Sequence, residues 1–245
     1  MHFLLLILLL TLGISQEKTI ELEDVFNGTF SSSGIGRFDW INGEDAYYFS
    51  QSDSDGKHFY KYNVASDDTT KAFSIDSELI DQFSSTFSSD QTKLLLKTNN
   101  VKIWRHSSYG TYHIYDINSN SIQSVSDEPD SLRNVKFSPN SEHVSYVRND
   151  NNIYIYSLSS LEETQVTFDG SETILNGHFG WVYEEEFGSY DAYRWSPNSQ
   201  YIAFCREDQS MVRKYPLIDY ETKYPTVKYI YLSLIHISEP TRRRG

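Results

Sequence analysis

One pattern of hydrophobic and polar positions occurs four times between residues 40 and 204. Each copy has an aromatic residue, a turn rich in Ser, Pro, Asn, Asp or Gly, one or two polar residues, and an apolar run that predicts a strand. The copies are WINGEDAYYF (Trp40–Phe49), FSSDQTKLLL (Phe87–Leu96), FSPNSEHVSYV (Phe137–Val147) and WSPNSQYIAF (Trp195–Phe204). Their leading aromatic residues lie 47, 50 and 58 positions apart. Periods of about 40 to 50 residues with a strand–turn–strand core are typical of β-propeller blades.

A second strand-like run follows each of the first three copies. These runs are HFYKYNVAS, TYHIYDINSNS and NIYIYSLSS. Ile and Tyr alternate over residues 153–156, which suits a strand with both faces covered. We therefore predict an all-β fold, a partial β-propeller with about four blades. An unrelated β-sandwich is the alternative, and four copies with similar turn chemistry make it the weaker interpretation.

The last interval between copies is the longest, and its excess coincides with the stretch GHFGWVYEEEF. We interpret this stretch as an insertion in a blade, and such loops commonly carry functional sites. Three consecutive glutamates between aromatic residues fit neither a plain strand nor a plain helix, so we expect a turn of irregular backbone. Clustered carboxylates repel one another unless a cation relieves them, which predicts a cationic ligand. A solvated acidic turn is the alternative.

The run GWVYEEEF and the following YDAYRWSPNSQYIAF closely resemble the glutamate motif of the dipeptidyl peptidase IV family. Members of this family are serine aminopeptidases that remove N-terminal dipeptides. In the family, the second and third glutamates of the motif hold the α-ammonium group of the substrate. The resemblance therefore implies that Glu185 and Glu186 bind the free N-terminus of a peptide.

A second segment, VKIWRHSSYGTYHIYDI, resembles the part of the family in which an Arg after a Trp reaches into the substrate channel. That position is Arg105 here, and the resemblance implies that its guanidinium orients a backbone carbonyl of the residue being removed. An Arg stacked on Trp104 and solvated is the alternative. His106 follows directly, and we expect it to be structural.

Family members have eight blades followed by an α/β-hydrolase domain, so residues 38–232 correspond to the first blades and the hydrolase domain is absent. The chain has no GxSxG nucleophile motif, metal-ligand spacing or nucleotide-binding motif, so we predict no catalytic residues, metal or cofactor within it. Two hypotheses follow. Either the chain is the N-terminal portion of a dipeptidyl aminopeptidase, or it is a non-catalytic propeller module that binds peptides or proteins.

The composition of the chain limits the classes of partner that it can bind. The chain has 245 residues, 38% of them hydrophobic and 15% aromatic, which is enough for a sizeable core. Its formal charge of −13 argues against nucleic acid and against adhesion to anionic membranes. The expected partner is a peptide with a free N-terminus. A homodimer is expected only for the full-length protein.

The N-terminus predicts the secretory pathway. Residues 3–12 are almost wholly apolar, and small residues precede a cleavage position after Ser15, which predicts a signal peptide over residues 1–15. This run is too short to span a bilayer, so a secreted protein is preferred over a type II membrane protein. Asn27 lies in the one glycosylation sequon, NGT. Residues 16–37 form a lead-in that contains a short strand or helix.

Two further features concern the end of the chain. Cys205 is the single cysteine, so no internal disulfide can form, and its setting YIAFCRED predicts a small buried residue in a strand. Residues up to Tyr231 still resemble the family. The segment 233–245, SLIHISEPTRRRG, reads as a non-native tail, and a basic tail that binds an acidic partner is the alternative.

Overall fold

The computed structural model describes residues 19–31, 36–126, 131–221 and 224–231. The chain divides into two compact units, residues 1–37 and 38–245. In the first unit the sequence left a strand and a helix open, and the structure has the helix α2 (Leu22–Phe26). A capping box forms the N-terminus of this helix. The backbone N–H of Glu21 donates to Asp24 Oδ2 at 3.2 Å, and the Glu21 side chain accepts the backbone N–H of Asp24. The predicted signal peptide lies outside the described residues, as does the tail 233–245.

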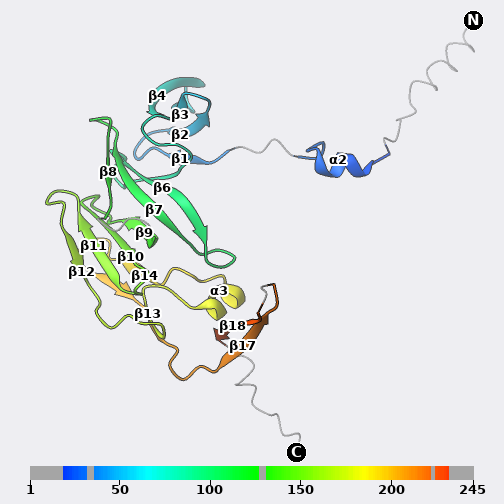
Figure 1. Cartoon of the computed structure of the whole chain (residues 1–245). Coiled ribbons are helices and arrows are strands. Elements are labelled where there is room, and N and C mark those ends of the chain that lie inside the picture. The colour runs from blue at the N-terminus through cyan, green and yellow to red at the C-terminus, as the bar shows by residue number, and fades with distance from the viewer. Residues whose placement is uncertain (1–18, 32–35, 127–130, 222–223, 232–245) are drawn as a thin grey trace, which may run out of the picture. The chain divides into compact units, whose positions relative to one another are not determined.

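Three antiparallel four-stranded sheets make up most of the second unit (Figure 1). Strands within each sheet follow chain order, as expected for propeller blades. The first sheet contains β1 (Phe38–Trp40), β2 (Ala46–Ser52), β3 (Gly56–Asn63) and β4 (Asp68–Asp76). The second contains β5 (Ser84–Phe87), β6 (Lys93–Lys102), β7 (Ser108–Asp116) and β8 (Ser121–Ser124). The third contains β9 (Arg133–Phe137), β10 (His143–Val147), β11 (Ile153–Ser157) and β12 (Glu163–Gln165).

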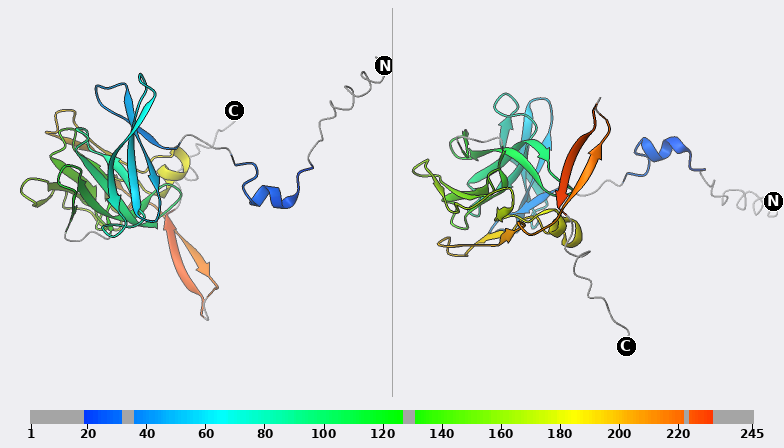
Figure 2. Two further views of the ribbon diagram at one scale, coloured as in Figure 1. Left: turned by 90° about the horizontal axis from the view of Figure 1, so that it is seen from above. Right: turned by 60° about the horizontal axis from the view of Figure 1, so that its bottom comes forward.

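A fourth blade begins with a two-stranded pair, β14 (Tyr193–Trp195) and β15 (Ile202–Phe204). Two further pairs accompany it. They are β13 (Ile174–Asn176) with β16 (Arg206–Asp208), and β17 (Lys214–Asp219) with β18 (Thr226–Tyr231). Figure 2 shows that the β17–β18 hairpin projects away from the other sheets. The predicted partial propeller is therefore confirmed, with three complete sheets and the start of a fourth.

The repeated sequence pattern coincides with the first turn of each blade. The leading aromatic residues end the first strands β1, β5, β9 and β14. Each following turn contains one residue in the left-handed region, and these residues are Gly43, Gln91, Ser141 and Ser199, with φ of 78°, 58°, 59° and 59°. In the last three copies this residue lies four positions after the aromatic residue, and its N–H donates to the carbonyl of the serine three positions before it at 2.9 Å, whereas Gly43 lies only three positions after Trp40. The turn chemistry that defined the repeat in the sequence thus corresponds to one backbone geometry in the last three copies.

The same turn residues join neighbouring blades. Gln91 Oε1 accepts the backbone N–H of Asn42 at 3.0 Å. Ser141 Oγ accepts the N–H of Asp90 at 3.1 Å, and Ser199 Oγ accepts that of Asn140 at 2.9 Å. A side chain of each blade therefore satisfies a backbone donor in the turn of the preceding blade, which holds successive sheets in one relative arrangement.

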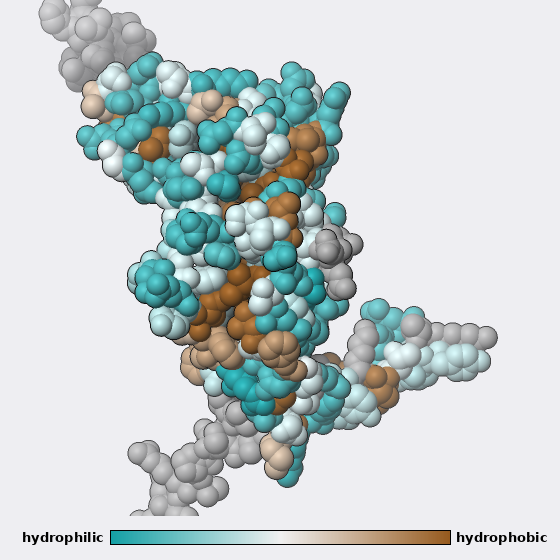
Figure 3. Space-filling model, turned by 90° about the vertical axis from the view of Figure 1, so that its left-hand side faces the viewer, coloured by the Kyte–Doolittle hydropathy of each residue, from teal (hydrophilic) through white to brown (hydrophobic). Residues whose placement is uncertain are grey.

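Apolar side chains fill the spaces between the sheets. Leu94 and Leu96 belong to the cluster against the first sheet, whereas Leu95 belongs to the cluster against the third. This division follows from the alternation of side chains along a strand and confirms that β6 is covered on both faces. A smaller cluster containing Val147 and Tyr193 joins the third sheet to β14. On the face drawn in Figure 3, apolar surface forms a band bordered by hydrophilic surface.

The prediction for Cys205 was wrong. Its thiol is exposed, and the residue lies between the short strands β15 and β16 rather than inside a strand. Flanking apolar residues suggested a covered strand, but the neighbouring Phe204 is itself 41% exposed. The fourth sheet has no further strand over this position among the described residues.

Candidate functional site

The glutamate stretch forms a helix, α3 (Trp181–Phe187), and not the irregular turn that we expected. Gly180 caps its N-terminus in an extended conformation. Gly188 ends it with φ of 63°, a left-handed conformation that glycine adopts without steric cost. The N–H groups of Gly188 and Ser189 donate to the carbonyls of Glu184 and Tyr183, both at 3.0 Å. The insertion is thus a compact helical turn closed at both ends by glycine.

Helical geometry gives the three glutamates three different environments. Successive residues turn about 100° around a helix axis, so three in a row cannot share one face. Glu184 is only 1% exposed, the Glu185 side chain is 23% exposed, and Glu186 is exposed. A helix can therefore carry this stretch because one carboxylate is buried with partners while the other two remain at the surface.

The buried carboxylate of Glu184 connects α3 to the loop that carries Arg105. Glu184 Oε1 accepts the backbone N–H groups of His106 at 2.5 Å and Ser107 at 2.9 Å. Burial by itself would raise the pKa of Glu184, but hydrogen bonds from Ser107 and His106 outweigh it and hold the pKa below the usual 4.5. Figure 1 shows the loop between β6 and β7 reaching α3. Sequence reasoning gave Glu184 no role, because its partners lie 77 and 78 positions away.

The guanidinium of Arg105 pairs with the carboxylate of Glu185. Arg105 Nε lies 3.3 Å from Glu185 Oε1, and Nη2 lies 3.2 Å from Oε2. These two parallel contacts form the fork that arginine offers to a carboxylate. The Arg105 side chain is 68% exposed, so the pair remains accessible to a ligand.

Among the described residues, Glu186 is the one acid of the stretch whose carboxylate has neither a hydrogen-bond partner nor a charge partner. Arg105 balances one of the two accessible acids, which leaves the site with a net negative charge. A cation placed between Glu185 and Glu186 would relieve that charge.

Other candidate chemistry is sparse. Among the described residues, no group of three or more His, Cys, Asp or Glu side chains is placed to hold a metal ion. No helix in the described ranges is long and apolar enough to cross a membrane. In the first unit, exposed Asn27 follows α2, and its Oδ1 accepts the Thr29 N–H at 2.9 Å.

Residues 88–231 match the protein family described as the dipeptidyl peptidase IV (DPP IV) N-terminal region. This match covers more than half of the chain. The chain belongs to this family. Both site segments, the Arg105 loop and α3, lie within the matched range.

Individual relatives agree with the family. Dipeptidyl aminopeptidase B of Saccharomyces cerevisiae is 42% identical over 151 residues, which cover 59% of this chain and 18% of that protein. The crystal structure of Porphyromonas gingivalis dipeptidyl peptidase 4 aligns with a TM-score of 0.74 and 31% identity, covering 88% of this chain and 31% of that one. The chain thus spans less than a third of the length of these relatives. The fold and the family are those of the DPP IV N-terminal propeller region.

Proposed function

We propose that this DPP IV propeller region binds the free N-terminus of a peptide and thereby positions it for removal of an N-terminal dipeptide. The single observation that carries the proposal is the forked contact of Arg105 with Glu185, beside the unpaired carboxylate of Glu186. In the complete protein the reaction would be that of a serine exopeptidase releasing X-Pro or X-Ala dipeptides.

The arrangement suits an ammonium group for electrostatic reasons. Two adjacent carboxylates offer acceptor oxygens to its N–H donors and compensate its charge. Arg105 holds the Glu185 carboxylate in one orientation, and its outer N–H groups remain available to a peptide carbonyl. Fixing both the ammonium and the first carbonyl defines the distance to the bond that is cleaved. This lowers the entropic cost of presenting that bond to a nucleophile.

The remaining parts of the proposal concern access and location. The propeller would admit extended peptide ends and exclude folded protein surfaces. We also propose that the protein is secreted, on the basis of the signal-like residues 1–15 and the exposed Asn27 sequon. Loss of a glycosidase-sensitive mass shift in Asn27→Gln, expressed in a secreting eukaryotic cell, tests the sequon.

The central experiment uses the full-length product of the gene and a chromogenic Gly-Pro substrate. Glu185→Gln and Glu186→Gln should each lower kcat/KM by about 100-fold, since a charge-assisted contact to the ammonium is lost. Glu162 is an exposed glutamate just before β12 with no side-chain contact in the described structure, so Glu162→Gln is the matched control and should have no effect. Unchanged kcat/KM in both site variants would refute the proposed role. Specific peptide binding without turnover in the wild type would instead indicate a non-catalytic module.

A further inference from the structure

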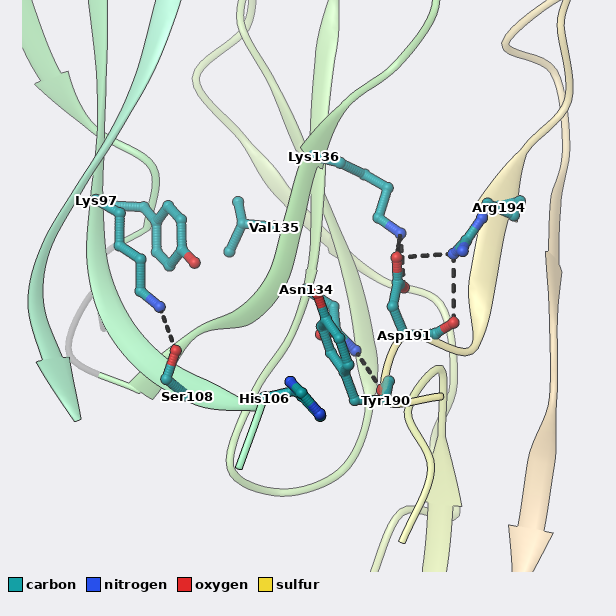
Figure 4. A pocket seen from close by; sticks show the side chains of 10 residues that line it. Lys97, His106, Ser108, Asn134, Val135, Lys136, Tyr190, Asp191 and Arg194 are labelled. Atoms are coloured by element: carbon teal, nitrogen blue, oxygen red, sulfur yellow. Dashed lines mark hydrogen bonds and ion pairs between the residues drawn. The ribbon is translucent and has the colours of Figure 1, made fainter. Parts of the chain in front are cut away.

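A cavity of about 570 Å³ lies beside the Arg105 loop and is lined by positively charged side chains (Figure 4). Its walls come from β6 and β7 of the second sheet, β9 of the third, and the segment that leads from α3 into β14. His106, which directly follows Arg105, and Tyr190, just after α3, line one side of it. Their rings stack with centroids 6.3 Å apart. The cavity therefore borders the two segments that carry Arg105, Glu185 and Glu186, the proposed ammonium site.

The charges in this basic pocket do not balance. Lys97, Lys136 and Arg194 supply three cations, and among the described residues that line the pocket Asp191 is the single carboxylate. Lys136 Nζ lies 2.7 Å from each Asp191 oxygen, and Arg194 Nη1 lies 2.7 Å from Asp191 Oδ2. Two cations thus share one acid, as Figure 4 shows. The pocket keeps an excess of positive charge, although the chain as a whole carries −13.

Lys97 is the cation that the pocket leaves without an acid. Its Nζ donates to Ser108 Oγ at 2.5 Å and lies 5.7 Å from the centroid of the Tyr112 ring. No carboxylate of the described residues forms a salt bridge with it. The side chain is half-buried, and that burial lowers the pKa of Lys97. A half-buried ammonium whose one hydrogen-bond partner is neutral has lost part of its hydration. An incoming anion would compensate for this loss by accepting the free N–H donors and balancing the charge.

We propose that the basic pocket binds the side-chain carboxylate of a peptide whose N-terminal residue is Asp or Glu, with Lys97 as its main contact. The inference rests on the proposed function, because Glu185 and Glu186 must hold the ammonium for the side chain to enter the pocket. The acidic ammonium site and the basic pocket then form a pair of opposite charges. This pair complements the ammonium and the carboxylate that an acidic N-terminal residue carries together.

The test compares substrates that differ by one charge. With the full-length protein, kcat/KM is measured for Glu-Pro, Gln-Pro, Asp-Pro and Asn-Pro chromogenic substrates. The wild type should prefer each acid over its amide by about fivefold, the order expected for a partly exposed charge pair. Lys97→Met should abolish this preference, and Lys97→Arg should retain it. Lys71→Met, which changes an exposed lysine on β4, is the matched control and should preserve the preference.

Each outcome decides a separate point. Cleavage of all four substrates with no preference for acids overturns the pocket proposal but leaves the ammonium site intact. If no substrate is cleaved, calorimetric binding of the Glu-Pro and Gln-Pro dipeptides to wild type and Lys97→Met takes over as the readout. Equal affinities for the two dipeptides then refute the inference. A third outcome is that inorganic phosphate binds to the wild type but not to Lys97→Met, while acid and amide substrates are treated alike. This outcome would indicate a site for free anions and would also overturn the proposal.

Discussion

The Glu184 carboxylate lies 2.5 Å from the backbone nitrogen of His106, so the helix of the glutamate motif holds the loop next to Arg105. Replacing Glu184 with Gln turns two charge-assisted hydrogen bonds into neutral ones. It also places an amide NH₂ donor at the position of Glu184 Oε2, which has no hydrogen-bond partner among the described residues. We expect Glu184→Gln to lower the free energy of unfolding by about 1–3 kcal/mol. Chemical denaturation monitored by tryptophan fluorescence measures this.

Glu78→Gln is the matched control for this measurement. Glu78 is exposed and its side chain has no contact in the described structure, so the change should fall within about 0.5 kcal/mol of wild type. Equal stabilities of Glu184→Gln and Glu78→Gln would contradict the structural role given to Glu184.

The contribution of Glu184 should also depend on pH. Its pKa is lowered in the folded protein, so the unfolded chain binds a proton at higher pH than the folded one. The stability that the ionised group provides is fully present above the ordinary value of 4.5 and is lost as pH falls through the lowered pKa. The stability difference between wild type and Glu184→Gln should therefore shrink as pH falls below 4.5. A difference that stays constant down to about pH 3 would argue against this titration.

The salt bridge between Arg105 and Glu185 should matter far more for binding than for folding. Because the Arg105 side chain is 68% exposed, water screens the pair, and we expect a coupling energy of about 0–1 kcal/mol. A double-mutant cycle with Arg105→Met and Glu185→Gln measures it by denaturation. The same Arg105→Met variant should lower kcat/KM by about tenfold, less than Glu185→Gln, since it loses a contact to a neutral carbonyl. A coupling above about 2 kcal/mol would instead assign the pair a structural role.

His178 provides a second pH dependence with the same sign. Burial, with a smaller effect from Arg133, lowers the pKa of His178 to about 3, and its Nε2 lies 2.8 Å from Asn151 Oδ1. Between the ordinary value of 6.5 and about 3, the unfolded chain binds a proton that folded His178 does not. The free energy of unfolding of the wild type should therefore fall as pH drops below 6.5. In His178→Gln the free energy of unfolding should change less with pH over the same range. Identical slopes in the two proteins would show that His178 does not titrate in this way.

Much of the fold could be predicted because the propeller repeat is a local property of the sequence. Trp40, Phe87, Phe137 and Trp195 each end a first strand, and the polar turns after the last three adopt one geometry. The error at Cys205 had a different cause. A strand pattern indicates two faces, but whether another sheet covers a face is decided by residues elsewhere in the chain.

The candidate site could be predicted only in part. The resemblance pointed to Arg105 and Glu185, which the structure brings together, and to Glu186, which stays exposed. The helix was missed because three adjacent acids repel one another, and only distant backbone donors make burial of Glu184 favourable. Lys97 and Lys136 lie on strands of different sheets, so no local pattern could place them in one pocket.

All charged groups of the ammonium site lie between residues 105 and 186, and the carboxylate that joins their two segments lies there as well. Under the proposed function, every charged group that would bind the peptide N-terminus is present once the chain has been synthesised through α3. Under the proposed function, residues 105–186 contain every charged group that would have to be transplanted into another propeller to test for affinity toward peptide N-termini.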